Sequence, residues 1–399
     1  MQCERTNAPR PVSRRARPHR VLRVRCPPVK RPPPEAPRAD VTRARRGVLA
    51  LATLTACASA PDAPPLPTAP QWAPVGTVDF GPDDLSTPLD ITLTAPVTWL
   101  RVTAIPTGAT CLALAELTTV TGEGLVAPNN HGPYCTRCTW REAAVAEVGA
   151  LVLPDRTRSP RLRARFALRD CDFLVGALNP GTRSVRARVE SLGWTPSRQG
   201  TLSVQLVATP SAALSDDAAR ALQDGVAQHF DGTGIALRWS PTCRVTTDVG
   251  EGAALTWTSF DALHGLYTAA LSQCGGGDVL RVFLSACWRY RDAVTQSTTE
   301  PEGFTTRIPA GLFEDGVIDG IVLRAGQCPT GSAMPRPRVL AHELGHALGL
   351  FHSVEADGAP DDLADTTGDD VMNADPSRSP RGFTAGQAAV MLRYPRLRR

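Results

Sequence analysis

Alternating apolar and polar positions dominate residues 75–195. Residues 162–168 place Leu, Ala, Phe and Leu at every second position, and residues 185–189 do the same with Val, Ala and Val. A period of two with one polar face is typical of a half-buried antiparallel strand. Turn-forming residues at 106–108 and 179–181 separate such segments. Several short strands joined by turns predict an all-β, sandwich-like accessory domain at 75–195.

Residues 200–399 instead alternate apolar strands with helical patterns. Apolar residues recur at helical spacing from 219 to 230, and Ser215 before them can cap that helix. Strand–helix–strand order favours parallel pairing. Because an all-β domain precedes this helix-containing domain, the fold class predicted for the whole chain is α+β. We expect strands at 202–206, 234–240, 278–286 and 316–323, and helices at 215–230, 259–272, 337–349 and 384–394, the last opened by a capping box of Thr384 and Gln387.

The N-terminal region has the features of an export signal. Residues 1–40 are basic and Pro-rich without helix or strand periodicity, which predicts disorder. Arginines at 43, 45 and 46 precede a short apolar core, too short for a stable membrane span, so we expect a signal peptide at 41–56. The Ala/Pro-rich residues 57–74 then read as a tether. Because the signal lies far from Met1, a start near Val41 is an alternative in which residues 1–40 are not translated.

Leu54-Thr55-Ala56-Cys57 resembles the lipobox of bacterial lipoproteins. The resemblance implies cleavage before Cys57, lipidation of that cysteine and attachment to a membrane of the cell envelope. An ordinary cleaved signal peptide is the alternative, and it would give a secreted protein.

The net charge of +4 is unevenly distributed. Residues 1–56 carry 14 Lys and Arg against 3 Asp and Glu, whereas residues 57–399 carry 29 against 36. The body of the protein is therefore acidic and offers no basic surface for nucleic acid.

Export would place the cysteines in an oxidising compartment, where disulfides form. Of the 11 cysteines, eight lie beyond the export signal, the lipobox cysteine and the N-terminal segment, and they divide evenly between the two expected domains. Even numbers favour disulfides, whose pairing the sequence leaves open. The C-x-x-C at 135–138 could instead serve redox or zinc chemistry, but no second such pair accompanies it. The eight are Cys111, Cys135, Cys138, Cys171, Cys243, Cys274, Cys287 and Cys328.

One stretch, residues 342–352, carries the chemistry: it reads H-E-x-x-H-x-x-G-x-x-H. His342 and His346 are four residues apart, so on a helix they lie on one face and can bind one metal ion. Gly349 allows the chain to leave the helix sharply, which would bring back His352 as third ligand. Three imidazoles with one open position are typical of catalytic zinc, since structural zinc has four protein ligands. Glu343 can act as general base on a metal-bound water.

This stretch resembles the zinc signature of the metzincin metallopeptidases. Val371-Met372-Asn373 is similar to the methionine turn that lies beneath the zinc in that clan. The resemblance implies that His342, His346 and His352 bind zinc and that Glu343 is the base, with Met372 as the hydrophobic floor. It also implies a metzincin-like peptidase domain at 200–399, with a twisted mixed sheet, an active-site helix and a C-terminal helix. A strand near 317–324 could line the cleft and pair with an extended substrate, as the edge strand of that clan does, but the sequence leaves open which strand is the edge.

Two metzincin families remain open. Ser353 after the third histidine is similar to the matrixins, whereas residues 362–366, D-x-x-D-T, resemble an acidic stretch of the pappalysins. Thr367 departs from the latter pattern, where proline is usual. The aspartates between 357 and 370 could bind calcium, but a solvated acidic loop is the preferred interpretation.

The predicted function is zinc-dependent hydrolysis of peptide bonds in extracellular or periplasmic proteins. The alternative is a surface-anchored binding protein or adhesin whose metallopeptidase domain is vestigial. The intact glutamate and all three histidines argue against it, because a binding protein does not need the base.

Overall fold

The computed structural model describes most of the chain beyond residue 71. The described residues are 72–398, except for 84, 93–96, 106–109, 123, 127–142, 146–147, 153–160, 171–185, 195–196, 213, 249–253, 256–260, 276–277, 286–288, 292–297, 300, 306–307, 311–319, 329–330, 334, 355–360, 362, 367 and 375–381. The predictions for the export signal, Cys57, residues 57–71 of the tether and the C-x-x-C lie outside them, whereas residues 73–74, expected to end the tether, already belong to the first strand. No helix in the described part is long and apolar enough to cross a membrane.

The described strands between residues 73 and 194 form two antiparallel sheets. One contains β1 (Ala73–Asp79), β9 (Arg186–Trp194), β3 (Val97–Ile105), β7 (Val148–Val152) and β6 (Ala143–Val145), in that order. The other contains β2 (Leu89–Thr92), β8 (Arg161–Asp170), β4 (Thr110–Thr119) and β5 (Gly124–Val126), in that order. Apolar residues from both sheets share one buried cluster: Val78, Ile91, Leu100, Leu117, Leu162, Ala164, Phe166, Ala187 and Val189.

A mixed five-stranded sheet forms the core of the second half. Its order is β11 (Ile235–Arg244), β10 (Gly200–Ala208), β13 (Leu280–Ser285), β17 (Ile321–Arg324) and β16 (Gly303–Thr305). Every pairing is parallel except that of β16 with β17, which is antiparallel. β17, the described part of the strand expected near 317–324, is paired on both sides, so it is not the edge strand that the sequence left open. The edge position belongs to β16, which is too short to show a period in the sequence.

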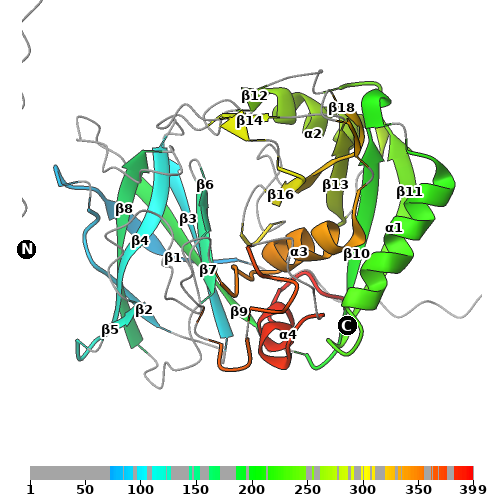
Figure 1. Cartoon of the computed structure of the whole chain (residues 1–399). Helices are drawn as coiled ribbons and strands as arrows, with labels where there is room; N and C mark the ends of the chain where they lie inside the picture. The colour runs from blue at the N-terminus through cyan, green and yellow to red at the C-terminus, as the bar shows by residue number, and fades with distance from the viewer. Residues whose placement is uncertain are drawn as a thin grey trace, which may run out of the picture. The chain divides into compact units, whose positions relative to one another are not determined.

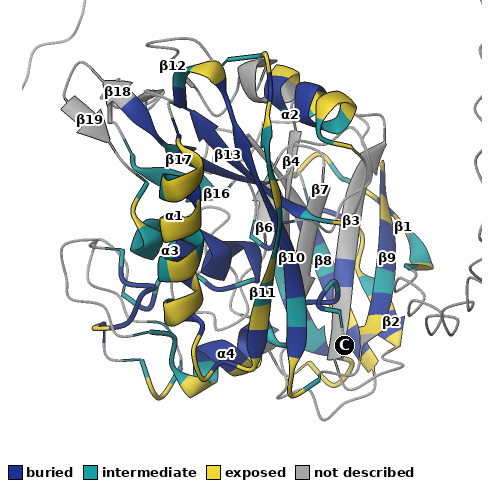
Figure 2. Cartoon of the chain, turned by 90° about the vertical axis from the view of Figure 1, so that its right-hand side faces the viewer, coloured by how far each residue is buried: buried dark blue, intermediate teal, exposed yellow. Residues whose placement is uncertain are grey.

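Both faces of this sheet are buried, because successive strand residues point to opposite sides. Even-numbered residues of β10 and β13, such as Val204 and Val282, join one large cluster with α1 (Asp216–His229) and α3 (Pro337–Ala347). Odd-numbered Val207 and Phe283 pack on the other side with α2 (Asp261–Gln273). Figure 2 shows the buried residues along β10 and β13 and the exposed outer face of α1. α4 (Ala385–Met391) completes the first cluster through Val390 and Met391.

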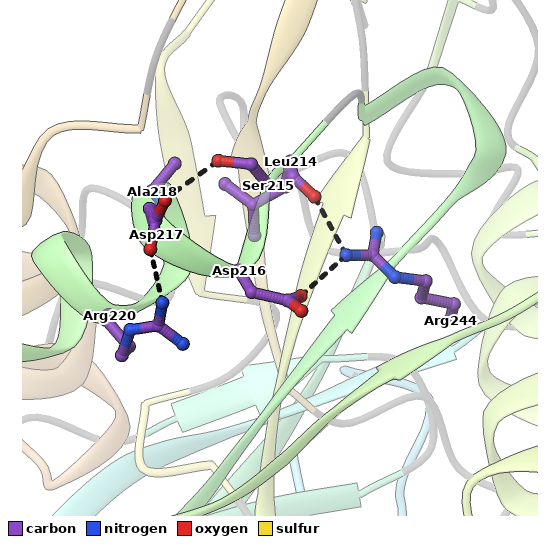
Figure 3. A network of polar contacts seen from close by, with 7 residues as sticks. All are labelled: Leu214, Ser215, Asp216, Asp217, Ala218, Arg220 and Arg244. Atoms are coloured by element: carbon purple, nitrogen blue, oxygen red, sulfur yellow. Dashed lines mark hydrogen bonds and ion pairs between the residues drawn. The ribbon is translucent and has the colours of Figure 1, made fainter.

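The start of α1 is fixed as the sequence predicts. Ser215 is the N-cap, and its Oγ accepts a hydrogen bond from the Ala218 amide at 3.1 Å. The Arg244 guanidinium, from the end of β11, donates to the Leu214 carbonyl at 3.0 Å and to Asp216 Oδ1 at 2.9 Å (Figure 3). These bonds connect the start of the helix to the neighbouring strand.

Several element ends differ from the expectations. The capping box of Thr384 and Gln387 is present, but α4 ends at Met391 rather than near 394. β11 is longer than expected and β13 shorter. A disulfide joins Cys243 of β11 to Cys274, directly after α2, with 5.6 Å between the Cα atoms. It is one of the disulfides that the even cysteine count favours.

Candidate metal centre

The active-site helix of the sequence prediction is α3. Arg336 is its N-cap and Pro337 its first residue. Proline is well suited to this position, because the N–H of the first helical residue makes no hydrogen bond within the helix. Leu340 and Leu344 bury one side of the helix in the large core cluster. The four-residue spacing brings the rings of His342 and His346 to a centroid distance of 4.6 Å, with 3.0 Å between their Nε2 atoms.

Gly349 ends the helix in the way the motif predicts. Its φ is +102°, a conformation that favours glycine. The Leu350 amide donates back to the Gly345 carbonyl and the Gly349 amide to the His346 carbonyl, both at 2.9 Å, which is a Schellman turn. The reversed chain carries His352 to ring-centroid distances of 5.2 Å from His342 and 4.9 Å from His346.

Hydrogen bonds to backbone carbonyls orient two of the rings. His342 Nδ1 lies 2.8 Å from the Val371 carbonyl oxygen, and His346 Nδ1 lies 2.7 Å from the Leu350 carbonyl oxygen. A carbonyl only accepts, so each Nδ1 carries the proton and Nε2 is the ring nitrogen with the lone pair that can bind a metal ion. Partners of this kind fix the ring orientation of metal-binding histidines.

The three histidines fit a zinc ion. One ligand atom from each lies within 4.8 Å of the other two, and no further His, Cys, Asp or Glu within the described ranges joins this group. Neutral imidazoles suit zinc, and three protein ligands leave a coordination position open for substrate or water.

The turn around Met372 lies directly against α3. Met372 is fully buried, its amide donates to Asp370 Oδ1 at 2.9 Å, and its carbonyl accepts from the Ser353 amide at 3.0 Å. A Cβ on Gly345 would fall well inside 3.0 Å of Met372 Sδ. Glycine at this helical position thus allows the turn to approach the helix backbone. The same turn presents the Val371 carbonyl to His342.

Glu343 lies beneath the edge strand. Only 5% of its surface is exposed, and burial raises the pKa of its carboxyl to about 8 against the opposing effect of hydrogen bonds from Thr305. A divalent cation held nearby would favour the ionised form. The Thr305 hydroxyl of β16 lies 2.8 Å from Glu343 Oε2 and 2.8 Å from the Glu343 carbonyl oxygen.

The acidic stretch after the histidines serves turns and helix ends. Asp361 Oδ1 accepts from the Leu363 amide at 3.1 Å. Asp365 accepts from Thr384 Oγ1 at 3.1 Å and from the Gly386 amide at 2.7 Å, so it holds the start of α4. The carboxylates of Asp361 and Asp365 thus have protein partners. Calcium binding stays a prediction. Asp362 and Thr367 lie outside the described residues.

Sequence reasoning missed three residues around this centre: Gly303, Thr305 and Asp370. Gly303 and Thr305 belong to a three-residue strand with no recognisable pattern. In the sequence, Asp370 stands out only as one aspartate of an acidic loop. Aspartate in turns often accepts a hydrogen bond from the amide two residues further on. The position of Asp370 two residues before Met372 is therefore the one signal in the sequence for its bond to the Met372 amide.

Neither a protein-family model nor a curated protein matches the sequence. Among solved structures, the chain is similar to metalloproteinase-II from Bacteroides fragilis, at 13% identity and a TM-score of 0.32, over 52% of this chain and 62% of that one. It is also similar to archaemetzincin from Methanopyrus kandleri, at 16% identity and a TM-score of 0.26, over 50% of this chain and 90% of that one. The chain thus spans less than two thirds of the Bacteroides protein's length. With TM-scores below 0.5, neither match assigns a family.

Proposed function

We propose that this chain is a zinc-dependent metalloendopeptidase with a metzincin-like catalytic region at 200–399. The observation that carries the proposal is the convergence of His342, His346 and His352 beside the buried carboxylate of Glu343. A structural zinc site would need a fourth protein ligand and has no use for such a carboxylate.

The chain's own groups divide the work of peptide hydrolysis. Zinc, when bound, polarises the scissile carbonyl and lowers the pKa of water. Glu343 accepts the proton of the attacking water and returns it to the leaving amine. β16 is the last strand of its sheet among the described strands, so its outer edge can pair with an extended peptide. The substrate is therefore a protein or peptide in extended conformation.

The decisive experiment measures cleavage of an unstructured protein such as casein by the chain exported to an oxidising compartment. Glu343→Gln keeps the size of the side chain and removes the base, so cleavage should be lost while zinc remains bound. Asp217→Asn, which changes an exposed carboxylate on α1, should leave cleavage unchanged. A chelator should abolish activity and added zinc should restore it. Cleavage that persists in Glu343→Gln would refute the assignment of the base.

We further propose that the protein is an exported bacterial lipoprotein anchored in the cell envelope through Cys57, with residues 75–195 as a β-sandwich-like accessory domain. The lipobox-like stretch at 54–57 and the two antiparallel sheets support these proposals. In detergent phase separation, the native protein should enter the detergent phase and Cys57→Ala should remain in the aqueous phase. Aqueous partitioning of both would favour an ordinary cleaved signal peptide and a secreted protein.

A further inference from the structure

Thr305 on the edge strand contacts the base of the proposed reaction. Its Oγ1 lies 2.8 Å from both the carbonyl oxygen and Oε2 of Glu343. We propose that Thr305 is a positioning residue, which fixes the Glu343 carboxylate so that Oε1 faces the attacking water. This inference rests on the proposed function and assigns a role to a side chain outside the histidine motif.

The backbone geometry of β16 directs Thr305 toward the base. Gly303 and Thr305 are two residues apart, so their side-chain positions face the same side of the strand. A Cβ on Gly303 would lie 3.1 Å from Glu343 Cγ and 3.0 Å from Val339 Cγ1, which places this face of the strand directly on α3. Figure 1 shows β16 and α3 beside each other. Glycine at 303 permits the close approach that Thr305 needs.

Contacts on both sides hold the strand at this position. β16 pairs with β17 in a register that places Thr305 opposite Ile321. Immediately before the strand, Glu302 Oε2 accepts from Arg336 Nε, at the N-cap of α3, at 2.7 Å. Thr305 therefore lies on a strand that pairs with β17 and is bonded, through Glu302 and Arg336, to α3, the helix that carries Glu343.

A single hydroxyl can serve Glu343 in both of its proton states. The hydroxyl has one proton, so it donates to one acceptor at a time. When Glu343 is ionised, Thr305 donates to Oε2. When Glu343 has taken a proton from the water on Oε1, Oε2 still accepts from the Thr305 hydroxyl. The carboxyl keeps its orientation through proton uptake and release.

Two substitutions separate the hydroxyl from the shape of the side chain. Thr305→Val keeps the shape and removes the hydroxyl, whereas Thr305→Ser keeps the hydroxyl and removes the methyl group. Loss of a hydrogen bond to a charged group should lower kcat of Thr305→Val on the order of tenfold to a hundredfold, with KM and zinc content unchanged. Thr305→Ser should stay within about threefold of the native enzyme, because the bond is retained.

Thr233→Val is the matched control. The Thr233 hydroxyl is buried and donates to the Phe230 carbonyl oxygen at 2.7 Å, in the turn after α1. Its removal should lower the unfolding midpoint and leave kcat unchanged. A fall in kcat from that substitution would show that any buried hydroxyl matters, and would overturn the specific role of Thr305.

The remaining outcomes are also decisive. Equal losses of kcat in Thr305→Val and Thr305→Ser would assign the effect to the shape of the side chain. A change confined to KM would assign it to contact with the substrate. An unchanged kcat in Thr305→Val would show that Thr305 does not position Glu343. Inactive native protein would refute the proposed function and with it the catalytic role. Urea unfolding would then report the bond separately: Thr305→Val should shift the midpoint in the native background and much less in the Glu343→Ala background.

Discussion

The same substitution, glycine to alanine, should have opposite effects in two helices of this protein. Alanine inside a helix is favoured over glycine by about 1 kcal/mol, because glycine loses more backbone freedom on folding. Gly265 lies exposed on α2, and a Cβ there would meet no atom within 4 Å. Gly265→Ala should therefore stabilise the protein by about 1 kcal/mol.

At Gly345 the helical gain is outweighed by a clash. A Cβ would lie well inside 3.0 Å of Met372 Sδ, 3.3 Å from Met372 Cε and 3.0 Å from Phe383 Cε1. Met372 is fully buried, and both of its backbone groups are bonded. Overpacking of this kind costs about 1 to 3 kcal/mol. We expect a net loss of up to about 2 kcal/mol, and hence a difference of about 1 to 3 kcal/mol between the two variants.

Urea unfolding of the metal-free protein, followed by tryptophan fluorescence, measures both variants under one condition. Zinc titration provides a second readout, because displacement of the turn moves the Val371 carbonyl that orients His342. Loss of such a partner weakens metal binding on the order of tenfold to a hundredfold. If Gly345→Ala stabilised the protein as much as Gly265→Ala, Met372 would be free to yield, and its role as a fixed floor of the site would be refuted.

Three further predictions concern the third histidine, the acidic stretch and the disulfide. His352→Ala should weaken zinc binding strongly in competition with a chelator while leaving the metal-free fold intact; unchanged affinity would exclude His352 as a ligand. Asp365→Ala removes two bonds at the start of α4 and should lower the free energy of unfolding by about 1 to 2 kcal/mol, measured by urea unfolding; no loss would show that Thr384 alone suffices as cap. Replacing Cys243 and Cys274 together by alanine opens a link across 31 residues and should lower the free energy of unfolding by about 3 to 4 kcal/mol, with unchanged stability as the contrary result.

Much of the candidate site could be predicted because it is local in sequence. The four-residue spacing of His342 and His346 fixes their common face on any helix, and Gly349 supplies the conformation that turns the chain back toward them. Ser215 and Thr384 were likewise recognisable as caps, since each bonds an amide only three residues further on. Interactions that span a single turn depend little on the rest of the fold.

Strand order could not be predicted in the same way. The segment near 317–324 is apolar, and apolar strands occur at edges and in sheet interiors alike. Its place between β13 and β16 results from which neighbours pack on each side. Only three residues, Gly303–Thr305, form the edge strand, and so short a segment has no measurable period.

The sequence by itself determined the cluster of three histidines, the glutamate next to them in the motif, the turn that brings His352 back, and the change from an alternating to a helical pattern between the two halves. Only the tertiary structure decided what surrounds them: Thr305 on the Glu343 carboxylate, the Val371 carbonyl on His342, and Met372 against Gly345. The physical reason is the range of the interactions. A helix and its turn are fixed by neighbours a few residues apart, whereas these contacts join segments 27 to 38 residues apart and exist only once the sheet and helices have packed.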